Sequence, residues 1–212
     1  MIIEKIYNFI NMMKNQGQSE YFPPEEIFEA FHWASLDLFN EKFGEYEKTQ
    51  QLTDAMTPFK KNATKTKNAN LFDYPDEYFH ITNLSAITKN SEGVILTEYP
   101  ISIRTDGEWL ISKNSKLLAP TAEDAIARLD AEGIEVAPST VDEIKIYYVK
   151  EPVEAKYAYD NQDGEIIFKE QGSVDPEWRK PEITQLIKKT LQYFGIVIKD
   201  QELVNIDKII SE

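Results

Sequence analysis

Apolar residues near the start of the chain recur every three to four positions, which is the spacing of a helix face. The pattern predicts a helix over residues 2–13, a longer one over residues 24–43 and a short third one within residues 45–59. Pro24 suits the first turn of the second helix, and Gly44 suits its end.

The next segment, residues 60–70, carries four lysines and no large apolar side chain. This composition predicts an exposed, flexible loop. An arm that binds nucleic acid is the alternative, but the segment has neither the arginines nor the aromatic residues that favour it.

From residue 71 to residue 172 the pattern changes to alternation of apolar and polar residues, which is typical of strands. Strands are predicted over residues 93–105, 134–140 and 142–149. The clearest hairpin is predicted over residues 154–170, with its turn at residues 160–164.

Two local signals interrupt these strands. Asp106-Gly107 predicts the tight turn of a hairpin. Thr121, followed by acidic residues in a first turn, predicts a short helix over residues 121–133.

After residue 173 the chain is predicted to be helical again. Asp175-Pro176-Glu177 and Pro181-Glu182 both have the residues that begin a helix, so its start stays open between them. Gly195 is expected to end it.

The order of elements predicts an α+β fold, in which N-terminal and C-terminal helices form a helical body with a central β-rich insertion. Residues 1–70 are the first helical part and include the flexible loop. Residues 71–172 form the β-rich centre, and residues 173–212 return the chain to the helical body.

Composition narrows the classes of function. The net charge of −14 argues against a protein that covers duplex DNA by neutralising phosphates. The chain has no cysteine, which excludes disulfides and thiolate catalysis. It has no apolar run long enough to span a membrane and no signal-peptide pattern, so no membrane association is expected.

No set of residues with the spacing of a catalytic site stands out. The only histidines, His32 and His80, lack partners at metal-ligand or triad spacing. The loop from Asp160 has Gly164 at the fifth position of a calcium loop, where a ligand is required. No catalytic residue, cofactor or metal ion is therefore expected.

Aromatic residues are more informative, because they are enriched at protein interfaces. Trp178, between a predicted hairpin and a predicted helix, is the first candidate for a domain or subunit contact. The other interface candidates are Trp33, Phe39, Tyr157 and Tyr159.

Three blocks of sequence, in order along the chain, resemble virion structural proteins of phages that infect Bacteroidetes, including the crAss-like phages. The first block is YFPPEEIFEAFHWASLDLFNEKFG, with Glu29-Ala30 where the family commonly has asparagine. The matching residues are Phe22, Pro24, Glu26, Leu38, Phe39, Asn40 and Gly44, then Tyr74, Pro75, Asp76, Tyr78, Pro120, Thr121, Pro138, Tyr147, Tyr148 and Pro152, and finally Asp175, Glu177 and Trp178.

The resemblance implies a ring protein of the neck or head–tail connector, located in the virion and assembled in the host cytoplasm. Its partners would be copies of itself in a ring of twelve, the portal protein and other neck or tail rings. Genomic DNA would pass through the lumen without specific binding. The alternative is a carbohydrate-binding or hydrolysing module of a phage tail, using Trp109 or Trp178 with nearby acids.

Overall fold

The computed structural model describes residues 1–16, 22–45, 50–89, 95–115, 117, 119–162 and 165–196. The chain divides into two compact units. Unit 1 contains Met1–Phe59 and Pro152–Glu212, and unit 2 contains Lys60–Glu151. Unit 1 is therefore built from both ends of the chain, whereas unit 2 is one continuous stretch.

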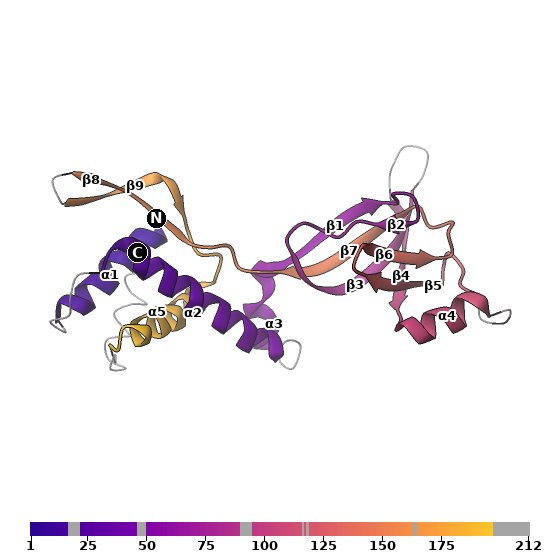
Figure 1. Ribbon diagram of the computed structural model, residues 1–212, viewed down its shortest axis with the longest axis horizontal. Coiled ribbons are helices and arrows are strands. Elements are labelled where there is room, and N and C mark those ends of the chain that lie inside the picture. The colour runs from indigo at the N-terminus through magenta and orange to yellow at the C-terminus, as the bar shows by residue number, and fades with distance from the viewer. Residues whose placement is uncertain are drawn as a thin grey trace. The chain divides into compact units, whose positions relative to one another are not determined.

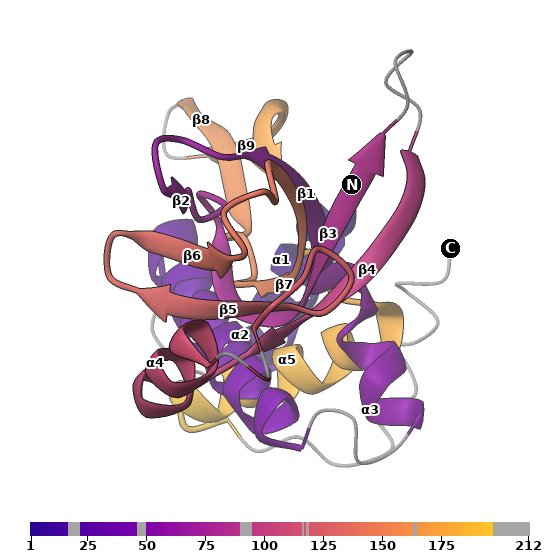
Figure 2. The ribbon, with the colours of Figure 1, turned by 90° about the vertical axis from the view of Figure 1, so that its right-hand side faces the viewer.

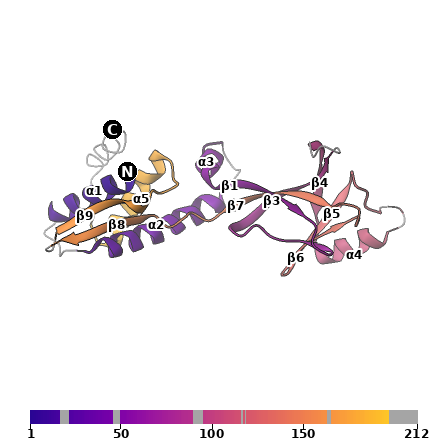
Figure 3. The same cartoon turned by 90° about the horizontal axis from the view of Figure 1, so that it is seen from above.

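Helices and a β-hairpin make up the described part of unit 1 (Figure 1). Its elements are α1 (Ile2–Gln16), α2 (Pro24–Gly44), α3 (Gln50–Ala55), the 3₁₀ helix η1 (Thr57–Phe59), β8 (Lys156–Gln162), β9 (Glu165–Val174) and α5 (Lys180–Tyr193). Helix α2 packs against α5, and α1 contacts α5 and both strands of the hairpin (Figure 3).

The core of unit 1 is formed by one apolar stripe from each of the three long helices. Burial of each such side chain contributes roughly 1.5–3 kcal/mol, so the stripes explain why α1, α2 and α5 pack together. The most buried members are Ile3, Ile6, Ile10, Ile27, Phe31, Leu38, Ile183, Leu186, Ile187 and Leu191.

The described part of unit 2 consists of a seven-stranded sheet and one helix. Its elements are β1 (Lys60–Thr66), β2 (Leu71–Phe72), β3 (Tyr78–Lys89), β4 (Ile95–Ile103), α4 (Asp106–Asn114), β5 (Ala125–Asp130), β6 (Gly133–Ala137) and β7 (Glu143–Lys150). The strand order is β1-β7-β3-β4-β5-β6-β2, and only β4 and β5 are parallel. The sheet curves until it is nearly closed (Figure 2).

One face of this sheet holds the core of unit 2. Leu84, Ile134, Ile144 and Ile146 are fully buried there. On α4, the indole of Trp109 is 1 % exposed and packs with residues of β5 and β6. This indole fixes the helix to the sheet.

The prediction of a helical body with a central β-rich insertion is wrong. The main feature of the fold is the curved seven-stranded sheet, and the helices are few. The predicted boundaries also differ from the two units, because β1 begins at Lys60 in unit 2 and the 156–174 hairpin belongs to unit 1. The architecture depends on pairing between strands that are distant in the sequence, and the local periodicity of apolar residues contains no information about that pairing.

Three local predictions fail for identifiable reasons. Residues 60–66 are not a loop, because every residue of β1 pairs with a residue of β7. Residues 106–114 form α4 and not a hairpin, because Thr105 and Glu108 make a reciprocal capping box. Residues 125–130 are the strand β5, paired with strands on both sides, and not a helix.

Other predictions are confirmed. The helices at residues 2–13 and 24–43, the strand at 142–149 and the 154–170 hairpin all occur, with boundaries a few residues different. Gly17, a residue type that suits the end of the first helix, and part of the hairpin turn lie outside the described residues.

The two candidate starts of the C-terminal helix are resolved in favour of the second, because α5 begins at Lys180 with Pro181 in its first turn. Asp175 has a different role. Its Oδ1 accepts a hydrogen bond of 2.8 Å from the backbone N–H of Ile3, in the first turn of α1. This carboxylate therefore satisfies a free N–H at the start of the N-terminal helix.

Candidate functional site

One face of α2 forms a wall of a cavity of about 590 Å³ in unit 1. Glu25, Glu29 and Trp33 are spaced four residues apart, so they lie one above the other on the helix. Residues 154–157, at the start of β8, also line the cavity. We call this cavity the acidic–aromatic pocket, and it is lined by Pro24, Glu25, Phe28, Glu29, His32, Trp33, Glu154, Ala155, Lys156, Tyr157 and Val174.

The lining of the pocket carries three carboxylates against one ammonium group. Glu25 Oε1 accepts a hydrogen bond of 2.5 Å from the Tyr159 hydroxyl. Within the described residues, the side chains of Glu29 and Glu154 make no ion pair or hydrogen bond, and both are exposed. Two carboxylates are thus left to attract a cation.

Aromatic rings provide the apolar part of the pocket. The rings of Phe28 and Tyr157 are stacked, with centroids 5.5 Å apart and planes within 8°. Tyr7 stacks on the same tyrosine at 4.4 Å. Trp33 is 56 % exposed, so its indole is available at the pocket for a cation or an apolar side chain.

The Tyr157 hydroxyl remains protonated far above neutral pH. Burial raises the pKa of this phenol to about 12, with further contributions from the nearby phenol of Tyr7 and carboxylate of Glu4. Near pH 7 this side chain is a neutral ring with an O–H donor. It has no role as a nucleophile or base at that pH.

His32 lies beside Trp33, with ring centroids 6.4 Å apart. Its Nδ1 atom is buried and has no hydrogen-bond partner among the described residues. The side chain as a whole is partly exposed and lines the pocket. The wall of the pocket therefore includes a buried imidazole nitrogen without a partner among the described residues.

The five predicted interface residues have different environments. Trp178, Phe39 and Tyr157 are buried in unit 1, with exposed fractions of 4 %, 1 % and 9 %. Tyr159 is partly exposed and bonded to Glu25. Trp33 is the one with a largely exposed side chain, and the pocket brings it together with Tyr157.

Trp178 makes an internal contact between distant segments. Its Nε1–H donates a hydrogen bond of 2.7 Å to Ser35 Oγ on α2. Its ring packs edge-on against Phe59 at 4.6 Å. The residue thus ties the segment before α5 to the N-terminal helices.

The two tryptophans on which the carbohydrate hypothesis depended are both buried. Trp109 is 1 % exposed and Trp178 is 4 % exposed. A sugar ring stacks only on an aromatic face that it can reach. Neither indole can serve as such a platform in this fold.

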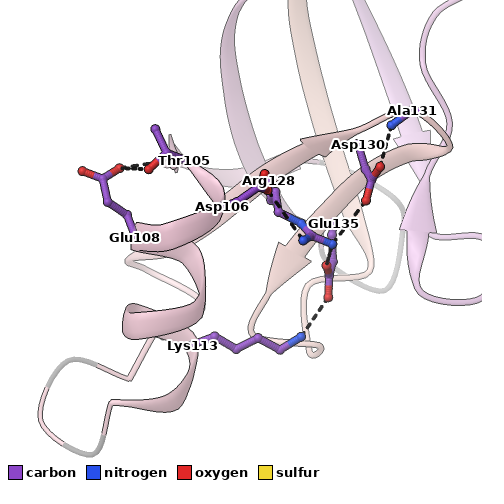
Figure 4. Close-up of polar contacts among 8 residues, drawn as sticks. All are labelled: Thr105, Asp106, Glu108, Lys113, Arg128, Asp130, Ala131 and Glu135. Atoms are coloured by element: carbon purple, nitrogen blue, oxygen red, sulfur yellow. Dashed lines mark hydrogen bonds and ion pairs between the residues drawn. The ribbon is translucent and has the colours of Figure 1, made fainter.

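A second polar cluster, in unit 2, is internally paired (Figure 4). The Arg128 guanidinium lies 3.0 Å from Glu135, 3.3 Å from Asp130 and 3.6 Å from Asp106. Lys113 Nζ bonds to Glu135 at 2.8 Å. These pairs connect α4 to β5 and β6, so we assign the cluster a structural role.

Comparison with known proteins adds no family. A search with protein-family models gives no match, and a search of curated protein sequences also gives none.

Two structural searches of the described residues were negative. No group of three or more histidine and carboxylate side chains is placed to hold a metal ion among them. None of their helices is long and apolar enough to cross a membrane.

The pocket combines residues that sequence reasoning did not connect. Glu154 lies far from Glu29 in the sequence, so only the packing of the chain on α2 reveals that they line one cavity. The spacing of Glu25, Glu29 and Trp33 was the available signal, since it marks a helix face away from the buried stripe. The arrangement is suited to binding a cationic group that carries an apolar portion.

Proposed function

We propose that the chain is a structural subunit of a phage virion. Copies of it assemble head to tail into a ring in the neck, between portal and tail, and genomic DNA passes through the ring. The observation that carries this proposal is the ordered resemblance of three sequence blocks, which extend from Phe22 to Trp178. The proposal rests on these blocks and not on the fold that the resemblance implied.

Exposed apolar side chains on both units support self-assembly. A closed ring requires two different complementary surfaces on each subunit. Unit 1 exposes Trp33 and Tyr193, at 56 % and 58 %. Unit 2 exposes Leu110 and Ile111 on α4, at 57 % and 72 %.

The charge of the chain is also compatible with a passage for DNA. A net charge of −14 repels phosphates. A ring wall with this charge would let DNA slide, because it offers no broad basic surface to retain it.

Light scattering on the purified full chain tests the proposal. The expected result is a closed oligomer, formed alone or on addition of the portal protein of the same phage. Mass spectrometry of purified virions should find the chain in the particle. A monomer that never joins portal or tail proteins, or virions without the chain, would overturn the proposal.

A further inference from the structure

One segment of this acidic chain carries several lysines and no acidic residue. Residues 55–72 contain four lysines and neither aspartate nor glutamate. Lys60, Lys61 and Lys65 are on β1, and Lys67 follows it. Strand β1 lies at an edge of the seven-stranded sheet.

These lysines differ in how they are engaged. Lys67 Nζ donates a hydrogen bond of 2.8 Å to the carbonyl of Ser139. The side chain of Lys61 is exposed and makes no ion pair or hydrogen bond with any described residue. Lysines on an edge strand discourage pairing with other strands. Protection of the edge does not by itself explain why the segment around the four lysines contains no acidic residue.

The acidic–aromatic pocket has the complementary chemistry. Glu29 and Glu154 supply two carboxylates without partners among the described residues. The indole of Trp33 supplies an exposed aromatic face for an ammonium group and for the alkyl stem of a lysine. A lysine therefore fits the site better than an anion or a purely apolar side chain.

We infer that the acidic–aromatic pocket of one copy binds the lysine-bearing strand β1 of a second copy, with Lys61 as the principal cation. The inference rests on the proposed ring, because it names the two surfaces that meet head to tail. Unit 1 supplies the pocket and unit 2 supplies the lysines, so the contact is between different surfaces and can repeat around a ring.

Charge reversal on each side of the contact provides the test. Glu29→Lys and Lys61→Glu are each expected to weaken self-association of the full chain by about tenfold or more. The double variant Glu29→Lys/Lys61→Glu should recover most of the affinity, because it restores opposite charges. Light scattering and sedimentation over a concentration series measure the dissociation constants, at low salt and at high salt.

Two further variants complete the design. Trp33→Ala is expected to weaken association without changing its salt dependence, since it removes the aromatic wall and no charge. Glu132→Lys makes the same change of charge as Glu29→Lys in an exposed turn of unit 2 and is the matched control. Circular dichroism establishes that every variant is folded.

The outcomes separate this inference from the proposed function. If the ring forms and the single reversals act no differently from Glu132→Lys, the pocket contact is wrong and the ring stands. If each single reversal weakens association but the double variant is no better, the pairing of Glu29 with Lys61 is wrong. If the wild-type chain does not assemble under any condition, including with portal protein, the proposed function itself fails.

Discussion

The indole of Trp178 and the hydroxyl of Ser35 join segments that are 143 residues apart in the sequence. Asp175 bridges a still longer interval, since its carboxylate accepts the backbone N–H of Ile3. Both acceptors satisfy donors that would otherwise be costly to bury or to leave at a helix start. At this scale, unit 1 is held together by a few polar contacts placed within an apolar core.

Ser35→Ala tests the most buried of these contacts. The substitution leaves the indole N–H of Trp178 without its acceptor, which is expected to lower the free energy of unfolding by about 1–3 kcal/mol. Urea unfolding followed by circular dichroism measures the change. Trp178→Phe in the same chain removes the donor, so the double variant should lose less than the sum of the two single changes.

Ser112→Ala on α4 is the control, because its hydroxyl makes no hydrogen bond with the residues that the structure describes. This change should alter the free energy of unfolding by less than about 0.5 kcal/mol. Equal effects of Ser35→Ala and Ser112→Ala would contradict the assigned role of the buried hydrogen bond.

Because of its raised pKa, the phenol of Tyr157 is expected to make the folded chain less stable at alkaline pH. Its pKa is raised from 10.0 to about 12 in the folded chain, so the unfolded chain releases this proton at lower pH. Between these values the folded state binds more protons, and the free energy of unfolding falls as pH rises. Below pH 10 the group has no effect on the pH dependence.

Tyr157→Phe should therefore flatten the decline in stability between pH 10 and about 12. Urea unfolding across that range provides the measurement. Ultraviolet titration of phenolate, taken as the difference between the two proteins, gives the pKa directly. A difference titration centred on pH 10 would show that the phenol is not shifted.

At the scale of elements, the sequence predicts best where one periodicity persists. Helix α2 carries a stripe of buried side chains and strand β7 begins with alternating burial, and both elements occur close to the predicted bounds. Strand β1 could not be predicted, because its side chains are polar and its order comes from pairing with β7. The start of helix α4 is set by a single capping box. Strand β5 is ordered by pairing with strands formed by other parts of the chain.

The candidate site follows the same rule. Trp33 was predicted as an interface residue from its type alone, and it is exposed at the pocket. Trp178 is also a tryptophan, but its side chain is buried. Sequence gives the chemistry of an aromatic residue, while its exposure depends on which distant segment packs over it.

Alanine substitutions at two glycines, one in strand β6 and one in helix α4, are expected to change the free energy of unfolding in opposite directions. At Gly133, φ is +155° and an added Cβ would lie 2.8 Å from the carbonyl oxygen of Phe72 on β2. Gly133→Ala is therefore expected to destabilise unit 2 by about 1–3 kcal/mol. An added Cβ at Gly107, in α4, would meet nothing within 4 Å, so Gly107→Ala should stabilise by about 0.5–1 kcal/mol.

Hydrogen exchange of amides in β2 and β6, together with thermal unfolding, distinguishes the two substitutions. Faster exchange at these strands is expected for Gly133→Ala alone. Equal behaviour of the two alanine variants would mean that the close approach of β2 and β6 does not constrain residue 133.

At the scale of the whole molecule, the two units differ in how they are built from the chain: unit 2 from one continuous stretch and unit 1 from two separate ones. Unit 2 is one continuous stretch whose first and last strands, β1 and β7, are paired. The pair Lys60↔Val149 brings the beginning of this stretch beside its end. Unit 1, in contrast, exists only when both ends of the chain are present.

This difference predicts that residues 60–151 fold in isolation. All residues of the main apolar cluster of unit 2 lie within this stretch, and a chain of this size can bury enough surface to fold alone. The isolated fragment should show a strand-rich circular dichroism spectrum and one cooperative thermal transition. A fragment of residues 60–139 is the control, since it omits β7, which separates β1 from β3 in the sheet. It should remain unfolded, and a 60–151 fragment that also lacks a cooperative transition would show that unit 2 depends on unit 1.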